Sequence, residues 1–280
     1  MKNYENLTLD EERALYGEKD IRIRDCRFDG PADGESALKE AGGVTVERCY
    51  FNLRYPLWHC DGVNIRNSEM TEGCRAALWY SNDVEIVGAI LHGIKAVREC
   101  RRVFISDCDV ISPEFGWFSS DIEVSNSKFV SEYFMLRSSD IKFSKVDFKG
   151  KYSFQYIENA VFDSCNFDTK DAFWHAKGVT VRNSTVKGEY LAWYSENITF
   201  ENCTIIGTQP LCYCKGLRLI NCRMIDCDLS FEKSEVEADV VGHIDSVKNP
   251  KRGLISADSI GEIIIEDGYD ACEIKIKEKL

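Results

Sequence analysis

The sequence predicts an all-β fold, a single-stranded parallel β-helix of about twelve coils. Three observations lead to this prediction: a short apolar segment recurs along the chain, the step between recurrences is mostly 19 residues, and turn-forming residues recur at fixed positions within each step. A unit of this length with short strands cannot bury its apolar face alone, so successive units must stack on one another. We expect right-handed coils, because Asn or Asp corners and bulky apolar side chains fit that form.

Each repeat begins with an apolar residue that opens a strand, and a second apolar residue follows two positions later, as in a strand with one buried face. A small residue stands five positions after the start and a large apolar residue seven after it, which predicts a second short strand beyond a corner. The step is 19 residues from Val84 onward, whereas the earlier steps are 23, 19 and 21. The predicted starts are Ile21, Val44, Val63, Val84, Val103, Ile122, Ile141, Ala160, Val179, Ile198, Leu217 and Val236.

The corner four positions after the start often holds Asn or Asp, as at Asn183, Asn202 and Asn221. Gly, Asn or Asp often stands directly before the start. These residue types tolerate left-handed backbone and form local hydrogen bonds at turns. Because equivalent corners of successive coils lie above one another, we expect their side chains to form ladders.

We predict one β-helix domain over residues 1–280 with both ends capped. An N-terminal cap covers residues 1–20, the coils cover residues 21–243, and C-terminal cap strands cover residues 244–280. A solenoid needs such caps because its terminal repeats would otherwise expose apolar surface.

The predicted N-terminal cap is helical, because Thr8 and Glu11 have the spacing of a capping box and Gly17 stands where a helix would end. The segments "GEIIIEDG" and "CEIKIKEKL" are predicted to be the strands that close the other end, since the repeat is lost beyond Gly242. The insertion at residues 29–43 explains the long first step and predicts a loop with a helical turn.

The composition is that of a soluble globular protein, with 44% hydrophobic and 29% charged residues. A formal net charge of −12 argues against nucleic acid and anionic membranes as partners, since these need a basic surface. It also disfavours polyanionic sugars unless a cation bridges them. No apolar stretch has the character of a signal peptide or the length of a membrane span, which predicts a cytoplasmic protein. In that compartment the thirteen cysteines are expected to remain thiols.

All five tryptophans occupy one repeat position, five residues before a start. Two residues later stands a row of small side chains, mostly Cys and Ser. We expect both rows to point inward, with the large rings packed beside small neighbours. The tryptophans are Trp58, Trp79, Trp117, Trp174 and Trp193.

The rows on either side of the tryptophans are also rich in aromatic and apolar residues, so whichever way the third strand is turned, an aromatic wall faces outward. Exposed rings at the coil spacing can stack sugar rings or contact a protein, because aromatic side chains give contact area at low entropic cost. We expect this wall to bind a neutral carbohydrate or a protein partner, or to form a homodimer; coverage by the protein's own terminal segments is the alternative. The predicted ligand-binding residues, four before each start, are His59, Tyr80, Glu99, Phe118, Arg137, Tyr156, His175, Tyr194 and Tyr213.

On these repeats the chain resembles the pectin lyase-like superfold of parallel β-helices, and more closely an uncharacterised bacterial family of single-domain β-helix proteins with a short 19-residue coil. Many members of the superfold are polysaccharide lyases and hydrolases, which makes a carbohydrate-active enzyme the alternative function. Polygalacturonase-like members carry an "NTDG" segment, an Asp pair, "GHG" and "RIK"; here "HCDGVNI", "SDCDV" and "LHGIK" match in part and out of register. Whether the protein is an enzyme is therefore left open.

An enzyme of this kind would need two carboxyl groups brought together on one strand or on adjacent coils. Glu99, Arg137 and Asp107 are the residues around which we would expect such a site in the wall. The segment "CYCKGLRLINCRMIDC" brings four cysteines close in sequence, but two of them fall on small inward rows, and the four histidines do not converge. We therefore predict neither a metal nor a cofactor.

Overall fold

The computed structural model describes residues 1–266 and 271–277. The chain forms two compact units, Met1–Lys142 and Phe143–Leu280, which are described separately here as unit 1 and unit 2. All described regular structure is β-strand, and the strands together make about 14 turns of a parallel solenoid.

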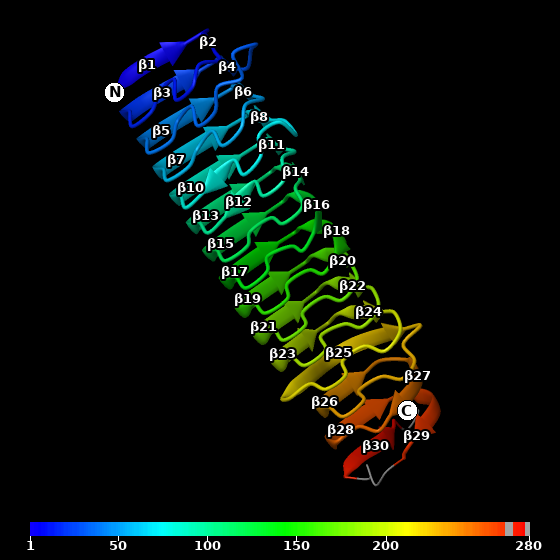
Figure 1. Ribbon diagram of the computed structural model, residues 1–280. Coiled ribbons are helices and arrows are strands. Elements are labelled where there is room, and N and C mark those ends of the chain that lie inside the picture. Colours follow the sequence, from blue (N-terminus) through cyan, green and yellow to red (C-terminus); the bar gives the residue numbers. More distant parts are fainter. Residues whose placement is uncertain (267–270, 278–280) are drawn as a thin grey trace. The chain divides into compact units, whose positions relative to one another are not determined.

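Unit 1 is a stack of coils, each with one long and one short strand (Figure 1). A third side is a strand in only two coils, at β9 (Leu78–Trp79) and β12 (Val97–Arg98), which pair in parallel. The long strands are β1 (Lys2–Glu5), β3 (Lys19–Arg24), β5 (Gly42–Glu47), β7 (Asp61–Arg66), β10 (Asn82–Val87), β13 (Arg101–Ser106) and β15 (Ser120–Ser125). The short strands are β2 (Thr8–Leu9), β4 (Arg27–Phe28), β6 (Tyr50–Phe51), β8 (Glu69–Met70), β11 (Ile90–Leu91), β14 (Asp109–Ile111) and β16 (Lys128–Glu132).

Unit 2 repeats this arrangement, and β17 (Ser139–Ser144) runs from one unit into the next. The long strands of unit 2 are β19 (Glu158–Asp163), β21 (Lys177–Arg182), β23 (Glu196–Glu201), β25 (Leu217–Ile225), β26 (Glu235–Val240), β28 (Arg252–Ala257) and β30 (Cys272–Ile276). The strands on the second side are β18 (Asp147–Lys151), β20 (Asn166–Asp168), β22 (Thr185–Lys187) and β24 (Thr204–Ile206). A separate parallel sheet consists of β27 (His243–Lys248) and β29 (Ser259–Ile264).

The predicted starts stack in register. Val63 pairs with Val44 in the coil before it and with Val84 in the coil after it, and every pairing is parallel. In unit 2, Val179 pairs in the same way with Ala160 and Ile198. The two-residue alternation and the constant step therefore fixed the strand register correctly, since a slip of one residue would turn the apolar row outward.

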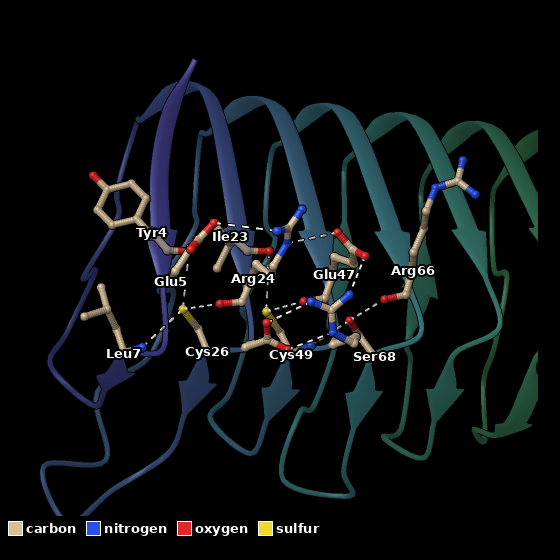
Figure 2. A network of polar contacts seen from close by, with 12 residues as sticks. Tyr4, Glu5, Leu7, Ile23, Arg24, Cys26, Glu47, Cys49, Arg66 and Ser68 are labelled. Atoms are coloured by element: carbon tan, nitrogen blue, oxygen red, sulfur yellow. Dashed lines mark hydrogen bonds and ion pairs between the residues drawn. The ribbon is translucent and has the colours of Figure 1, made fainter.

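The small inward row forms a hydrogen-bonded ladder at the corner between the two strands of each coil. In unit 1, the Cys49 amide donates to Ser68 Oγ over 3.0 Å, and Ser68 Oγ donates over 2.8 Å to the carbonyl of Arg66 (Figure 2). Cys26 Sγ lies one coil earlier, 3.2 Å from the carbonyl oxygen of Arg24. Cys and Ser recur here because each is small and satisfies backbone groups that the corner leaves unpaired.

The expected ladder of asparagine side chains, four residues after each start, is present in unit 2. Asn221 Nδ2 donates to Asn202 Oδ1 over 2.8 Å, and Asn202 Nδ2 donates to Asn183 Oδ1 over 3.4 Å. All three residues have positive φ, between 50° and 52°. The ladder thus compensates part of the cost of a left-handed corner.

The predicted N-terminal helix is wrong. Residues 12–17 form turns, and β1 and β2 already belong to a coil, because Lys2 pairs with Ile21 and Leu9 pairs with Phe28. The capping-box spacing is a weak signal in a segment that can instead pair with the next coil. The insertion at residues 29–43 likewise contains turns and the start of β5 but no helical turn.

The repeat continues where we expected it to be lost. Val236 pairs with Gly253, and Gly253 pairs with Cys272, so β28 and β30 extend the stack of unit 2. The predicted count of twelve coils is therefore too low, as β1, β28 and β30 are additional starts. The end of "GEIIIEDG" and the end of "CEIKIKEKL" lie outside the described residues. The single-domain boundaries and the handedness stay predictions.

Candidate functional site

The third side of the coil does not alternate as we predicted. The residues six positions before each start are fully buried, and so are the small residues three positions before it. The five tryptophans, which stand five positions before a start, are only half-buried. Two consecutive residues thus lie on the outside, because the residue four before the start has positive φ, as at Tyr80 (55°) and Tyr194 (61°). The expectation of inward tryptophans is wrong for this reason: a left-handed residue turns the chain within the strand.

The half-buried tryptophans serve as hydrogen-bond donors to the next coil. Trp58 Nε1 donates over 2.6 Å to the carbonyl of Ala76, which itself has positive φ (47°). Trp193 Nε1 donates over 2.8 Å to Gln209, and Gln155, a non-aromatic member of the row, donates its Nε2 to Asp171 over 3.0 Å. Where the position holds tryptophan or glutamine, the N–H at the end of the side chain satisfies a carbonyl that the left-handed corner leaves unpaired.

In unit 2 the predicted ligand-binding row is an unbroken stack of four rings. The centroids of Tyr156 and His175 are 4.8 Å apart, those of His175 and Tyr194 5.1 Å, and those of Tyr194 and Tyr213 4.8 Å. The interplanar angles are 8–13°. Each ring therefore covers the face of its neighbour, and the side of the stack that remains open to solvent consists of ring edges.

The exposure of these side chains agrees with that geometry. Tyr156 and Tyr194 are 42% and 44% exposed, whereas His175 and Tyr213 are half-buried. Burial and the nearby Glu232 carboxylate raise the pKa of the Tyr213 phenol, whose hydroxyl lies 3.5 Å from Glu232 Oε2. A stacked tyrosine presents its hydroxyl at the outer edge, so the row offers hydrogen-bonding groups one coil apart rather than open ring faces.

Charges beside the unit 2 stack alternate in sign. Glu158, Lys177 and Glu196 occupy one register row, and Lys215 continues it with its Nζ 3.8 Å from Glu196 Oε1. Although the whole chain carries −12, this row beside the stack is close to neutral. A neutral ligand would meet little electrostatic opposition there.

Unit 1 carries the same row with different contents. His59 and Tyr80 stack at 5.0 Å and Phe118 is 46% exposed, but Glu99 stands between Tyr80 and Phe118 in the row. Arg137, the last predicted member in this unit, is exposed.

Beside Glu99, Arg98 occupies a tryptophan position. Its guanidinium lies 4.8 Å from the ring centroid of Trp79 and 5.0 Å from that of Trp117, so it is held between two indoles. Arg98 Nε is 3.5 Å from Glu99 Oε1, and its NH1 is 3.8 Å from Glu114 Oε2. In unit 1 an ion-pair cluster therefore interrupts the aromatic wall. The Arg98 side chain at its centre is only 17% exposed.

The residues expected for an enzyme site are not brought together as a group. Glu99 precedes β13 and Asp107 follows it, so a strand of six residues, roughly 20 Å at ~3.3 Å per residue, separates them. The polygalacturonase-like set is likewise split: His92 Nε2 lies 3.3 Å from Asp109 Oδ1, while Asp61 stands at the beginning of β7.

Sequence reasoning missed Asp171, which lies at the left-handed corner (φ 54°) whose carbonyl Gln155 contacts. The residue is only 7% exposed, and burial raises the pKa of its carboxyl group. No motif marks it, because its row, eight residues before each start, has mixed contents, with tyrosines at 133, 152 and 190, Glu114 and Gln209. A buried carboxyl group next to a candidate wall is a typical functional signal.

The cysteines are packing residues rather than nucleophiles. All thirteen are free and twelve are buried, and burial raises the pKa of Cys60 and of Cys227 to about 12. Within the described residues no three His, Cys, Asp or Glu side chains converge as a metal site would require. In the same part of the chain, no helix of sufficient length and apolar character to cross a membrane was found.

Comparison with solved structures gives distant likenesses to parallel β-helix proteins. The mannuronan C-5 epimerase AlgE4 A-module of Azotobacter vinelandii is 14% identical, with 84% of this chain and 79% of that chain covered and a TM-score of 0.26. The surface adhesin PfbA of Streptococcus pneumoniae is 10% identical, with 83% and 76% covered and a TM-score of 0.29. The catalytic domain of a GH87 α-1,3-glucanase in complex with tetrasaccharides is 11% identical, with 99% and 64% covered and a TM-score of 0.26. None of these likenesses bears on the activity of this chain.

None of the curated proteins compared matches the chain. A family model does match over nearly the whole length, at residues 2–277. The expected resemblance to an uncharacterised family with the β-helix fold is thereby confirmed. The chain belongs to the family described as "Protein of unknown function (DUF3737)".

Proposed function

We propose that the protein is a binding protein that recognises a neutral oligosaccharide through the ring stack of unit 2. The observation that carries the proposal is the unbroken row Tyr156, His175, Tyr194 and Tyr213, with its rings 4.8–5.1 Å apart and its edges outward. Sugar hydroxyls need a series of donors and acceptors, and phenol and imidazole edges provide both.

This mode differs from the sugar stacking expected from the sequence. Stacking a sugar needs an open ring face, and in this row the faces are turned to neighbouring rings. A ligand that lies along the row would instead cross one ring edge per coil and bond to successive hydroxyls. The near-neutral charge row beside the stack favours an uncharged ligand over an acidic one.

Isothermal titration calorimetry against a panel of neutral oligosaccharides of increasing length tests the proposal. We expect affinity to rise with length up to four sugar units, because each unit adds contacts to one more ring edge, and we expect Tyr194→Phe to weaken binding about tenfold, the loss of one ~1.4 kcal/mol hydrogen bond. Phe118→Ala is the matched control, since it removes a ring of the same repeat row from unit 1. Equal losses in both variants, or no binding by any oligosaccharide, would contradict the proposal.

A carbohydrate-active enzyme on the same unit is the second candidate, and Asp171 is the observation in its favour. A carboxyl group whose pKa is raised by burial keeps its proton to a higher pH than an exposed carboxyl group, and it can donate that proton to a leaving oxygen. Of the charges nearby, Lys170 lowers this pKa and Glu189 raises it, both by less than burial does. Lys170 Nζ lies 2.8 Å from Glu189 Oε2, so the two opposite charges beside Asp171 form an ion pair.

Product analysis by chromatography separates the two candidates. If the oligosaccharide that binds is also cleaved, and Asp171→Asn abolishes cleavage while the dissociation constant stays the same, the enzyme is supported. Binding without any product after prolonged incubation leaves the binding protein as the function.

A further inference from the structure

The first and the last described coil differ in the residues at their inward positions. In unit 1, the first long strand β1 places Lys2 and Tyr4 at positions that pair with the fully buried Ile21 and Ile23 of β3. Lys2 Nζ and the Tyr4 hydroxyl both bond to Glu18 Oε1, over 2.8 and 2.9 Å. Charged and polar groups at inward positions are a typical protection of a sheet edge against association.

The last described coil of unit 2 has no such protection. Ile274 and Ile276 of β30 pair with Ile255 and Ala257 of β28, both of which are fully buried. Ile276 itself is 54% exposed, and Ile263 on β29 is 47% exposed. Among the described residues β30 pairs with β28 alone, so its second edge presents backbone donors and acceptors beside apolar side chains.

The outward side chains of β30 are arranged for self-pairing. Glu273 and Lys275 flank Ile274 and lie 3.0 Å apart in one strand. If two copies of β30 run antiparallel about a two-fold axis at Ile274, Glu273 of each lies opposite Lys275 of the other. Opposite charges across a pair of strands stabilise it, and like charges destabilise it. Cys272 then lies opposite Ile276 of the second copy, so the inward row stays apolar across the axis.

We propose that the protein forms a two-fold symmetric dimer in which the β30 edges of two copies pair antiparallel about Ile274. The partner is a second copy of this chain, because the order Glu273, Ile274, Lys275 is self-complementary across a two-fold axis. An isologous contact of this kind closes on itself. The polar first coil does not compete for this edge, which prevents head-to-tail growth into fibres. This inference does not depend on the proposed ligand.

Light scattering coupled to gel filtration on the full chain is the first test. We expect twice the 31.9 kDa monomer mass for the natural sequence. Glu273→Lys and Lys275→Glu should each give a monomer, since each sets two pairs of like charges across the axis. An equimolar mixture of the two variants should recover the dimer mass, because each strand then meets its complement. A monomeric natural chain, or a dimer that neither variant affects, overturns the proposal.

A cross-link tests the register independently of charge. Ile276→Cys should form a disulfide with Cys272 of the second copy under mild oxidation and run at twice the mass on a non-reducing gel. The two positions are four residues apart in one strand, roughly 13 Å, so they cannot join within a chain. Ile276→Cys with Cys272→Ser is the control and should stay uncross-linked. Equal cross-linking in the control would contradict this register. A further variant, Tyr194→Ala, changes the ring stack and should leave the dimer mass unchanged, because the β30 edge is a separate surface.

Discussion

The same repeat row has different contents in the two units, and this difference concentrates the candidate site in unit 2. In unit 2 the row is four stacked rings, whereas in unit 1 it is interrupted by Glu99 beside the Arg98 cluster. The coils have the same length from Val84 to Val236. The repeat thus sets the position of each side chain in this row. The residue type at that position decides whether the surface carries a polar ring edge, as in unit 2, or an ion pair, as at Glu99 in unit 1.

Trp193→Ala should have the largest effect on stability, because it removes a large ring that packs against the ring stack of unit 2. Trp193 stacks on Trp174 at 5.6 Å, contacts Tyr213 at 5.4 Å and satisfies the carbonyl of Gln209. We expect a loss of about 3 kcal/mol in the free energy of unfolding. Urea denaturation measures it, with Trp193→Phe expected to lose about 1 kcal/mol for the unpaired carbonyl. A loss under 1 kcal/mol for the alanine variant would show that the rings are not structurally coupled.

Arg98→Ala should have the next largest effect and tests the corresponding support in unit 1. The change removes a cation held between Trp79 and Trp117 and takes one partner from each of two carboxylates, of which Glu114 keeps Lys95 and Glu99 keeps the Trp79 indole N–H. We expect a loss of about 2 kcal/mol, less than for a fully buried pair because the cluster is part-exposed. Arg98→Gln, which copies the residue found at position 155, should recover part of the loss. If salt at 1 M abolishes the whole effect, the pairing is a surface interaction without a contribution from the indoles.

Asp171→Asn should change stability in a pH-dependent way. Because burial raises the pKa of Asp171 in the folded chain above the ordinary value of 3.8, the folded state holds its proton more tightly than the unfolded state. Stability therefore falls as the pH rises from the unfolded pKa through the folded pKa, and the penalty is complete above the folded pKa. The asparagine variant should melt at a higher temperature than the natural chain at pH 7 and show no such advantage below pH 3.8. Thermal melts at both pH values measure this, and a destabilised variant at pH 7 would point to a structural role for the carboxylate.

Tyr194→Phe should have the smallest effect on stability. The ring and its stacking remain, and 44% of the side chain is already exposed. We expect a change within about 0.5 kcal/mol, as for most surface substitutions. The reciprocal Phe118→Tyr change in unit 1 should be equally neutral in the same denaturation experiment. A large loss in the first variant alone would mean that the hydroxyl holds the fold together and is not available to a ligand.

The sequence by itself determined the repeat, the two strands of each coil and their register, because apolar alternation and a constant step leave one way to bury every start. It also predicted the asparagine ladder and the small inward row. These features depend only on residue type at a fixed position. The first and last coils escaped prediction, since their inward positions hold Lys2, Tyr4 and Gly253 instead of large apolar residues.

Only the tertiary structure decided which way the third side faces. His59, Tyr80 and Tyr194 adopt positive φ although none is glycine, a conformation that costs each residue about 1 kcal/mol in isolation. Stacking on identical corners above and below offsets this cost, and no local sequence pattern reports that compensation. The outward half-burial of the tryptophans, the edge-on rings and the Arg98 cluster all follow from these corners, so the candidate site became visible only when the coils were stacked.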